Sequence, residues 1–424
     1  MNGRSEYQYM GLITRDDIIK AAFRVWGREL YLATSLNDLA KELKVSKAAL
    51  YRHFRNKEAI LDAMYEYFFD DHIAFIRDGY ERALGAPDFL ESAVILTRVI
   101  VEYYLRNVDS FIFSLMRVYG SRKIEAAGEA LRRRGVDMSR FRPRNEPASD
   151  YPSLFQMLTA TLTFWVAIFH NRGQTSKGAW TEKSPAEAEI RAMIGVVEEK
   201  IIRGLGLQKE LLDTLDYEAL EQNIPRSQLS AFKDGDLLKA VAETVAAAGP
   251  WNVSLDMIAR RSGLSKSGLY AHFRSKQDML RSFFLTEFER MIRYAQGGMA
   301  ASEAPPEQFY LALVSLADYL RSRPEILMAV DWLRTRRLDL ELEIPVRLYR
   351  IFSGISLPGA EPVSVPGGGG ESGPETEYVS QWILFLIVNT LIQRPPGMDF
   401  SEVPNAGIRR LYRFVCLGLK GFET

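Results

Sequence analysis

The sequence SKAALYRHFRNK, from Ser46 to Lys57, is repeated further along the chain as SKSGLYAHFRSK, from Ser265 to Lys276. Eight of the twelve positions hold the same residue in both copies. Repetition at a fixed distance indicates that one structural unit is used twice. The phrase gathers Lys, Tyr, His and Arg, whose side chains hydrogen-bond to phosphates and to base edges. It therefore points to two nucleic-acid-binding units in one chain.

The similarity continues upstream of the repeated phrase at the same spacing. Ser35-Leu36 corresponds to Ser254-Leu255, and Asp17 corresponds to Asp236. Each repeated block therefore covers roughly fifty residues. Within the first block, Ile19, Phe23 and Trp26 form the apolar stripe of an amphipathic helix.

Capping residues divide each block into three short helices. Ser35 is expected to cap the second helix, and Ser46 a third helix that buries Leu50 and Phe54. In the second block Ser254 and Ser265 take these places. Three short helices with a tight turn between the last two form a helix-turn-helix.

The charge of the chain is local rather than global. The 424 residues have a formal net charge of zero, whereas residues 41–57 hold six basic residues and one acidic residue. Residues 260–276 hold five basic residues and no acidic residue. Two basic segments on a neutral chain favour contact with nucleic acid at two places, although each alone also fits a solvated helix face.

Several other classes of protein are not indicated. The single cysteine, Cys416, excludes an internal disulfide and a cysteine-based metal cluster. No pairing of a nucleophile with a base, phosphate-binding loop or paired carboxylate is recognisable, so we expect no enzyme, no cofactor and no metal. The N-terminus does not resemble a signal peptide. Residues 153–170 are apolar, but polar residues dilute them, which favours a buried helix and no membrane contact.

Long helices are expected after each repeated block, and no strand pattern is apparent. In the first half they cover about Phe89 to Leu105, Ser153 to His170 and Pro185 to Leu205. The last two have counterparts at about Glu375 to Gln393 and Asn405 to Phe422. Between them, residues 356–376 are rich in Gly, Pro and Ser, which predicts a disordered loop.

These segments resemble a known family. The arrangement TRDDIIKAA, then SLNDLA, then VSKAALYRHFRNKEAIL is similar to the DNA-binding region of TetR-type bacterial transcriptional regulators. The second copy, VSLDMIARRSGLSKSGLYAHFRSKQDML, resembles it equally. The likeness covers roughly a quarter of the chain. It implies an all-α fold in which each helix-turn-helix domain is followed by a helical ligand-binding and dimerisation domain.

The expected domains are 12–68 (first helix-turn-helix), 69–206 (first regulatory domain), 207–230 (connecting segment), 231–288 (second helix-turn-helix) and 289–424 (second regulatory domain).

The resemblance also implies which residues meet DNA, because the third helix of the family enters the major groove. Base edges are assigned to Lys47, Ala48, Ala49 and Arg52, and to their counterparts Lys266, Ser267, Gly268 and Ala271. Phosphates are assigned to Tyr51, His53 and Lys57, and to Tyr270, His272 and Lys276. The expected DNA-contacting residues also include residues at or just after the start of a helix. These are Ser35, Asn37, Ser46, Ser254, Asp256 and Ser265.

An effector site is implied only by the resemblance. The candidate residues are aromatic or Met side chains on the expected regulatory helices, of which most would be plain core. They are Phe111, Phe113, Met116, Tyr119, Phe155, Phe164, Trp165 and Phe169, with Phe111, Met116, Phe155 and Trp165 as the selected set. The effector would be a small apolar or amphipathic molecule.

Two features depart from the family pattern. Lys44 stands at the turn before the third helix, where the second copy has Gly263 and where a left-handed backbone would cost a non-glycine residue about 1–2 kcal/mol. In addition, family members typically carry one DNA-binding domain per chain and act as homodimers. The tandem predicts that helices 153–205 pair with helices 375–422 inside one chain, forming a pseudo-dimer, with a homodimer of tandem chains as the alternative.

The resulting functional prediction is a sequence-specific, cytoplasmic, DNA-binding transcriptional regulator. Repression is favoured over activation, since occupying a promoter requires no contact with polymerase. The rival interpretation is an effector- or protein-binding module that has lost DNA binding and keeps its DNA-binding domains as scaffold.

Overall fold

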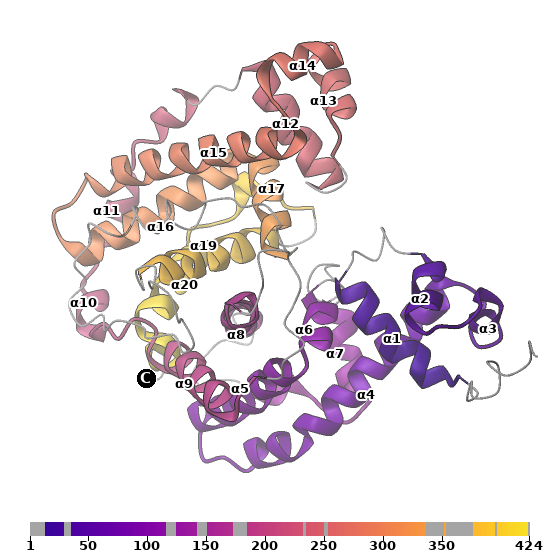
Figure 1. Ribbon diagram of the computed structural model, residues 1–424. Helices are drawn as coiled ribbons and strands as arrows, with labels where there is room; N and C mark the ends of the chain where they lie inside the picture. The colour runs from indigo at the N-terminus through magenta and orange to yellow at the C-terminus, as the bar shows by residue number, and fades with distance from the viewer. Residues whose placement is uncertain are drawn as a thin grey trace, which may run out of the picture. The chain divides into compact units, whose positions relative to one another are not determined.

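The protein folds into two compact units of helices. The computed structural model describes residues 13–28, 35–115, 124–141, 151–172, 185–231, 235–249, 253–335, 352, 376–394 and 397–422. Unit 1 comprises residues 1–141 and 173–186, and unit 2 comprises residues 142–172 and 187–424. Every regular element in the described ranges is a helix, which confirms the all-α prediction (Figure 1).

Unit 1 contains the first helix-turn-helix and the helices that follow it. Its helices are α1 (Arg15–Arg28), α2 (Leu36–Glu42), α3 (Lys47–Tyr51), α4 (Lys57–Leu84), α5 (Phe89–Arg106), α6 (Val108–Phe113), α7 (Ile124–Arg132) and the 3-10 turn η2 (Met138–Arg140). The predicted helix over Phe89 to Leu105 is thereby confirmed as α5.

Unit 2 contains the second helix-turn-helix together with helices from both halves of the sequence. Its helices up to the second helix-turn-helix are α8 (Tyr151–Arg172), α9 (Glu187–Arg203), α10 (Lys209–Asp213), α11 (Tyr217–Gln222), η3 (Arg226–Ala231), α12 (Asp236–Ala248), α13 (Leu255–Ser262) and α14 (Lys266–His272). The remainder are α15 (Lys276–Met299), α16 (Pro305–Ser322), α17 (Pro324–Thr335), α19 (Thr376–Ile392), η4 (Phe400–Glu402), α20 (Ala406–Leu417) and η5 (Gly418–Phe422). The predicted loop 356–376 lies outside the described residues except for Thr376, which begins α19.

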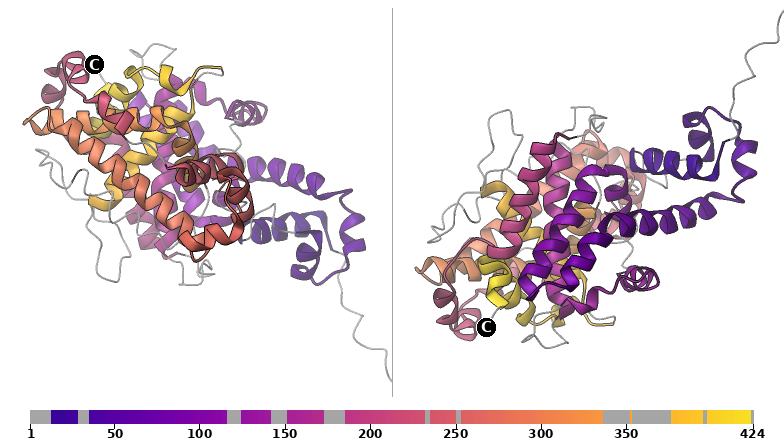
Figure 2. Two further views of the ribbon diagram at one scale, coloured as in Figure 1. Left: turned by 90° about the horizontal axis from the view of Figure 1, so that it is seen from above. Right: turned by 90° about the horizontal axis from the view of Figure 1, so that it is seen from below.

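The first helix-turn-helix is held by an apolar stripe on α1. Ile19, Phe23 and Trp26 are each at most 5% exposed, as the spacing predicts. Phe23 packs edge-on against Phe113 of α6, with 5.0 Å between ring centroids. The long α4, which Figure 2 shows extending away from α1–α3, supplies Phe68 to the same cluster. This packing joins the first helix-turn-helix to the helices that follow it in unit 1.

A buried histidine lies in the core of unit 1. His72 of α4 is surrounded by the rings of Phe68, Tyr103 and Tyr104, at 4.6–5.6 Å between centroids. Its Nδ1 atom has no hydrogen-bond partner. Burial lowers the pKa of His72 to about 4, so the imidazole is neutral at physiological pH.

The final helix pairs of the two halves pack against each other in unit 2. Trp382 Nε1 of α19 donates a hydrogen bond to Thr161 Oγ1 of α8 (3.1 Å). The Trp165 and Trp382 rings lie 6.3 Å apart, and Phe164 meets Phe385 at 5.7 Å. The predicted contact between these helix pairs is therefore present within one chain.

The compact units divide the chain differently from the expected domains. Helices α8 and α9, assigned by sequence to a first regulatory domain at 69–206, belong to unit 2, because their apolar faces are covered by α19 and α20. Within the described residues, one stretch, Ser153–His170 of α8, is long and apolar enough to cross a membrane. Its packing against α19 is that of a core helix.

Two glycines form a close crossing between the ends of α9 and α20. Gly204 ends α9 with φ +60°, and Gly418 ends α20 with φ +60°. A Cβ atom on Gly204 would overlap the Val415 carbonyl oxygen and lie 2.8 Å from the Gly418 nitrogen. Beside the crossing, the Leu205 amide donates to the Val415 carbonyl (2.8 Å). Only glycine permits the two backbones to approach this closely.

The segment between the halves, expected as a connection at 207–230, is folded. It forms α10, α11 and η3, and it buries Leu212, Leu220 and Ile224. Glu221 of α11 accepts hydrogen bonds from Tyr310, Asn405 and Arg409. Burial opposes ionisation of this carboxylate, but these bonds hold the pKa of Glu221 below its usual range. The segment is therefore an integral part of unit 2.

The glycine crossing predicts a large loss of stability on adding a methyl group. Gly204→Ala and Gly418→Ala are each expected to lower the free energy of unfolding by about 3 kcal/mol or more, because the Cβ strains a left-handed backbone and overlaps the facing one. Urea unfolding followed by circular dichroism measures this loss. Gly195→Ala, within α9 and with no atom near its Cβ, is the control, expected to be neutral or stabilising by about 0.5–1 kcal/mol. Equal losses in all three variants would contradict the crossing as the cause.

The buried histidine predicts a loss of stability in acid. In the unfolded chain the imidazole binds a proton below its ordinary pKa of 6.5, whereas in the folded chain it does so only near pH 4. The contribution of His72 to the free energy of unfolding is therefore fully present above pH 6.5 and is lost as pH falls toward 4. At pH 5 the free energy of unfolding is lower by about 2 kcal/mol for this reason. His72→Met, which introduces the residue found at the equivalent position 291, is expected to remove this part of the pH dependence in urea unfolding. An unchanged pH profile would refute the assignment.

Candidate nucleic-acid interface

Helix caps fix the geometry of the first helix-turn-helix. Thr14 and Asp17 exchange hydrogen bonds at the start of α1. At the start of α2, the Asn37 amide donates to Ser35 Oγ (3.2 Å), and the Ser35 amide donates to Asp38 Oδ2 (2.7 Å). The bonds from Ser35 lower the pKa of Asp38. These caps satisfy backbone donors that a short helix leaves unpaired.

A left-handed residue makes the turn between α2 and α3. Lys44 has φ +54° and is the sole non-glycine residue with positive φ in the described ranges. The Val45 amide closes the turn by donating to the Ala40 carbonyl (2.9 Å). The conformation expected from the alignment of Lys44 with Gly263 is therefore present.

The third helix of the first copy is short and anchored on one side. Ser46 caps it by accepting a hydrogen bond from the Ala49 amide (3.3 Å). Leu50 and Phe54 are 1% and 4% exposed, as predicted, and they bury the inner side of α3. The opposite side is left open to solvent.

The second copy repeats this geometry. Ser254 and Ser265 cap α13 and α14, accepting bonds from the amides of Met257 and Gly268. Gly263 makes the turn with φ +71°, and Leu269 is fully buried. We call α1–α3 the first head and α12–α14 the second head.

Most of the predicted residues of the first head lie on the open side. Residues Ser35, Asn37, Ser46, Lys47, Ala48, Tyr51 and Arg52 are exposed, and His53 and Lys57 are half-buried. Ala49 is the exception, being 5% exposed. Its assignment to base edges is not supported, because it faces inward beside Leu50.

The second head presents a comparable set. Residues Asp256, Ser265, Ser267, Tyr270, Ala271 and His272 are exposed, and Ser254, Gly268 and Lys276 are half-buried. Lys266 begins α14, but its side chain lies outside the described part of the structure. Tyr51 and Tyr270 are 49% and 51% exposed, unlike typical core tyrosines.

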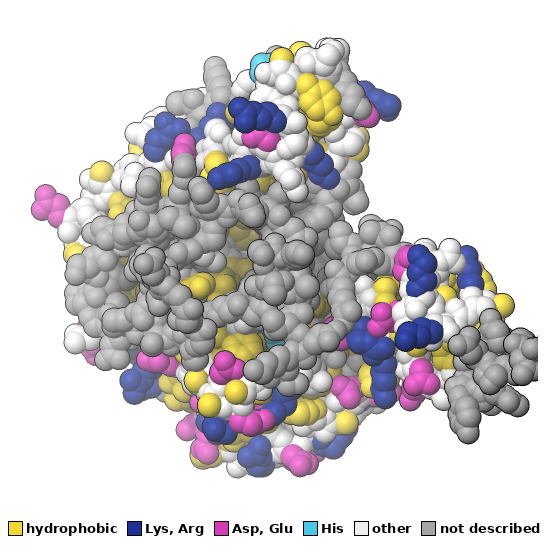
Figure 3. Space-filling model, in the orientation of Figure 1, with side chains coloured by type: hydrophobic (Ala, Val, Ile, Leu, Met, Phe, Trp, Pro, Cys, Tyr) yellow, Lys and Arg dark blue, Asp and Glu magenta, His cyan; other side chains and the backbone are white. Residues whose placement is uncertain are grey.

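Some basic side chains of both heads are available for a partner, whereas Arg24 and Arg261 pair with Glu42 and Glu243. No acidic residue of the described ranges pairs with Lys47, Arg52, Arg55 or Arg274, while Lys47 lies over the Tyr51 ring at 5.9 Å. Figure 3 shows Lys and Arg side chains over α2–α3 and over α13–α14. Arg55 and Arg274 were not selected from sequence, although their recurrence in the repeated phrase was a usable signal.

Comparison with known proteins agrees with this geometry. Residues 18–64 and 237–283 each match the family described as "Bacterial regulatory proteins, tetR family". Both heads are TetR-type helix-turn-helix domains.

Two curated relatives each match a short part of this chain. The uncharacterized HTH-type transcriptional regulator YuxN of Bacillus subtilis (strain 168) is 42% identical over 53 residues, which are 12% of this chain and 18% of that protein. The uncharacterized HTH-type transcriptional regulator YerO of the same strain is 32% identical over 73 residues, 17% of this chain and 25% of that protein. The chain therefore spans about a quarter or less of the length of these relatives.

A solved structure is weakly similar in shape. The transcriptional regulator FadR from Bacillus subtilis, in complex with stearoyl-CoA, aligns with 43% of this chain and 97% of that chain. Its sequence identity is 20% and its TM-score is 0.35, so the likeness supports no conclusion about ligand or assembly.

The selected effector residues are divided between the two units. Phe111 lies in unit 1 and is 1% exposed, beside Tyr104 at 5.6 Å. Trp165 is fully buried among rings of unit 2, and Phe155 of α8 is half-buried. Met116 lies outside the described residues. Phe111 and Trp165 thus serve as core, and the effector site stays a prediction.

The two TetR-type heads permit a reciprocal test of the turn. Gly263→Ala is expected to destabilise the second head by about 1–2 kcal/mol, because a Cβ is unfavourable at this left-handed position. Lys44→Gly is expected to be neutral or to stabilise the first head by up to about 1 kcal/mol, since relief of strain exceeds the added entropy of the unfolded chain. Hydrogen exchange of α3 and α14 amides measures both effects. A stabilising Gly263→Ala change would show that the turn is not strained.

Proposed function

We propose that this chain is a sequence-specific DNA-binding transcriptional regulator that contacts duplex DNA with both heads. The observation that carries the proposal is the recurrence of two features on two equally capped helix-turn-helix frames. Tyr51 and Tyr270 are exposed, and no carboxylate of the described residues forms an ion pair with Arg55 or Arg274. A cation that loses no internal ion pair on binding is well suited to neutralise a phosphate. If these side chains only stabilised the fold, they would not need to be exposed to solvent in both heads.

The two heads would read different sequences. Arg52 corresponds to Ala271, and Asn37 corresponds to Asp256. Arginine hydrogen-bonds in bidentate fashion to guanine, whereas alanine contacts at most a thymine methyl group. Asparagine pairs with adenine, and aspartate accepts from cytosine. The expected site has two related but unequal halves.

We further propose that one chain acts as the equivalent of a dimer. Helices α8 and α9 pack on α19 and α20, which supports an intramolecular version of the dimer bundle implied by the family resemblance. Tethering favours such pairing by a high effective concentration. The alternative is a homodimer of tandem chains with four heads.

The proposed regulatory role is repression, which requires only that the chain occupy the promoter. Two heads on one promoter would exclude polymerase, so the chain is proposed to repress transcription in the cytoplasm, under control of a small-molecule effector. The rival function is a binding module that no longer contacts DNA, and it predicts no salt-dependent binding to any duplex.

Selection of bound sites from random duplex DNA tests this proposal. We expect a non-palindromic sequence with two related halves about one helical turn apart or slightly more, because the base-facing residues of the heads differ. Light scattering of the complex is expected to give one chain per duplex. Recovery of a perfect palindrome would contradict reading by two unlike heads, and recovery of no enriched sequence would favour the rival function.

Substitutions in each head test its separate contribution. Arg52→Ala is expected to cost about 1–3 kcal/mol of discrimination in one half-site only. Tyr51→Phe and Tyr270→Phe are each expected to weaken binding to all sequences, as lost phosphate contacts do. Arg191→Gln, an exposed change on α9, is the control. If Tyr270→Phe leaves affinity unchanged while Tyr51→Phe reduces it, the second head does not contact DNA.

A further inference from the structure

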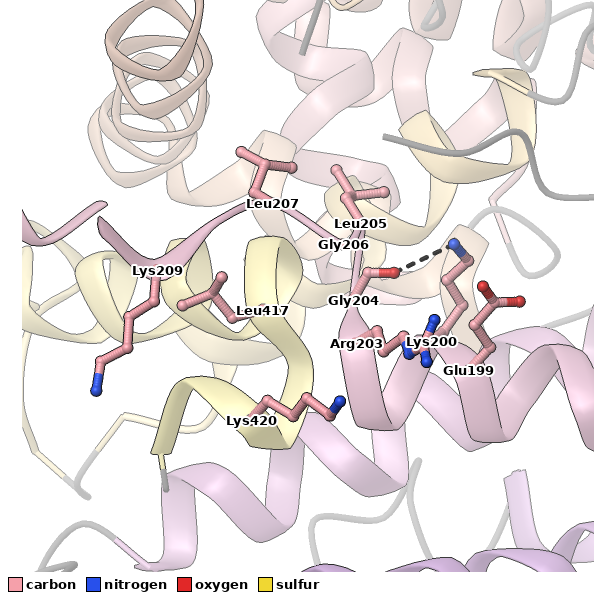
Figure 4. Close-up of a pocket in the computed structure, with 10 residues that line it drawn as sticks. All are labelled: Glu199, Lys200, Arg203, Gly204, Leu205, Gly206, Leu207, Lys209, Leu417 and Lys420. Carbon is pink, nitrogen blue, oxygen red and sulfur yellow. Dashed lines mark hydrogen bonds between the residues drawn. The ribbon is translucent and has the colours of Figure 1, made fainter. Parts of the chain in front are cut away.

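A pocket of about 360 Å³ lies where the end of α9 meets η5 (Figure 4). Its walls come from both halves of the sequence and from the segment between them. The lining includes Glu199, Lys200, Arg203, Leu207, Lys209 and Lys420. Figure 1 shows α9 and α10, which contribute lining residues, at the opposite end of unit 2 from α14, so the pocket is separate from the second head.

The pocket has an excess of positive charge. It contains four basic side chains, Lys200, Arg203, Lys209 and Lys420, against one carboxylate, Glu199. In the part of the chain that the structure describes, no carboxylate forms an ion pair with Arg203, Lys209 or Lys420. The charge of Lys209 is offset in part by the nearby Asp213 carboxylate. The positive charges that remain around the concavity repel one another, and an anion between them would remove that repulsion.

The base of the pocket is built rather than incidental. Lys200 is 3% exposed, and its Nζ donates to the Gly204 carbonyl (3.1 Å), as Figure 4 shows. Leu207 is tied to the facing segment by its amide, which donates to the Cys416 carbonyl (3.1 Å). These bonds and the glycine crossing hold the walls in place before any ligand arrives, which lowers the cost of binding.

We propose that this pocket binds a small oxyanion carrying at least two negative charges on phosphate or carboxylate groups. The Arg203 guanidinium offers a planar pair of donors to such a group, and Lys420 and Lys209 add point charges. The volume fits a small molecule rather than a macromolecule. Because Arg203 belongs to α9 and Lys420 to η5, the ligand joins the final helices of the two halves and stabilises their pairing by mass action.

Calorimetric titration of the full-length chain tests the proposal, with pyrophosphate and citrate as separate probes at constant ionic strength. At least one probe is expected to bind with one site per chain at millimolar concentration or below and to raise the melting temperature. Binding of pyrophosphate alone assigns phosphate chemistry, binding of citrate alone assigns carboxylate chemistry, and binding of both assigns recognition to charge.

Variants locate the binding. Arg203→Gln and Lys420→Gln, both at exposed positions, are each expected to lower the affinity for the probe by about tenfold or more. Arg191→Gln, an exposed change on the same helix, is expected to leave affinity unchanged. The proposal is overturned if neither probe binds the unaltered chain, or if all three variants bind equally, which would place the anion elsewhere, for instance on the heads.

Discussion

The contact on which unit 2 depends is the backbone approach of Gly204 to Gly418. Each glycine ends a helix with positive φ, and neither position has room for a Cβ. At this crossing the end of α9 meets the end of α20, and in the same unit α8 packs against α19. The basic pocket lies at the crossing, because Gly204 is one of its lining residues.

The two heads share a frame and differ in what the frame presents. Capping serines, a left-handed turn and one buried leucine recur in both, so the backbone geometry does not depend on the residues facing outward. The outward residues are then free to differ, as Arg52 and Ala271 do. Local backbone chemistry explains the likeness of the heads, and exposed side chains explain the proposed difference in the sequences they read.

The sequence predicted the heads well because their determinants are local. Caps, the stripe on α1 and the turn at Lys44 depend on residues a few positions apart, and the repeat supplied an independent copy of each. The burial of Ala49 was missed because the family resemblance assigns residues to the third helix but does not give the angle at which that helix packs against α2. The glycine crossing joins residues that are far apart in the sequence, so no local sequence pattern predicts it. The short helices at 207–231 were missed because their buried apolar side chains, such as Leu212, Leu220 and Ile224, are widely spaced. The polar contacts of Glu221 that also hold the segment join residues far apart in the sequence.

Because α8 packs on α19 within a single polypeptide, this contact does not depend on the concentration of the protein. Two separate subunits meet less often as their concentration falls, and below their dissociation constant they exist mainly apart. A contact between parts of one chain is independent of how many copies the cell contains. This bundle is as complete in a cell holding a handful of molecules as in a concentrated solution, and dilution does not take it apart.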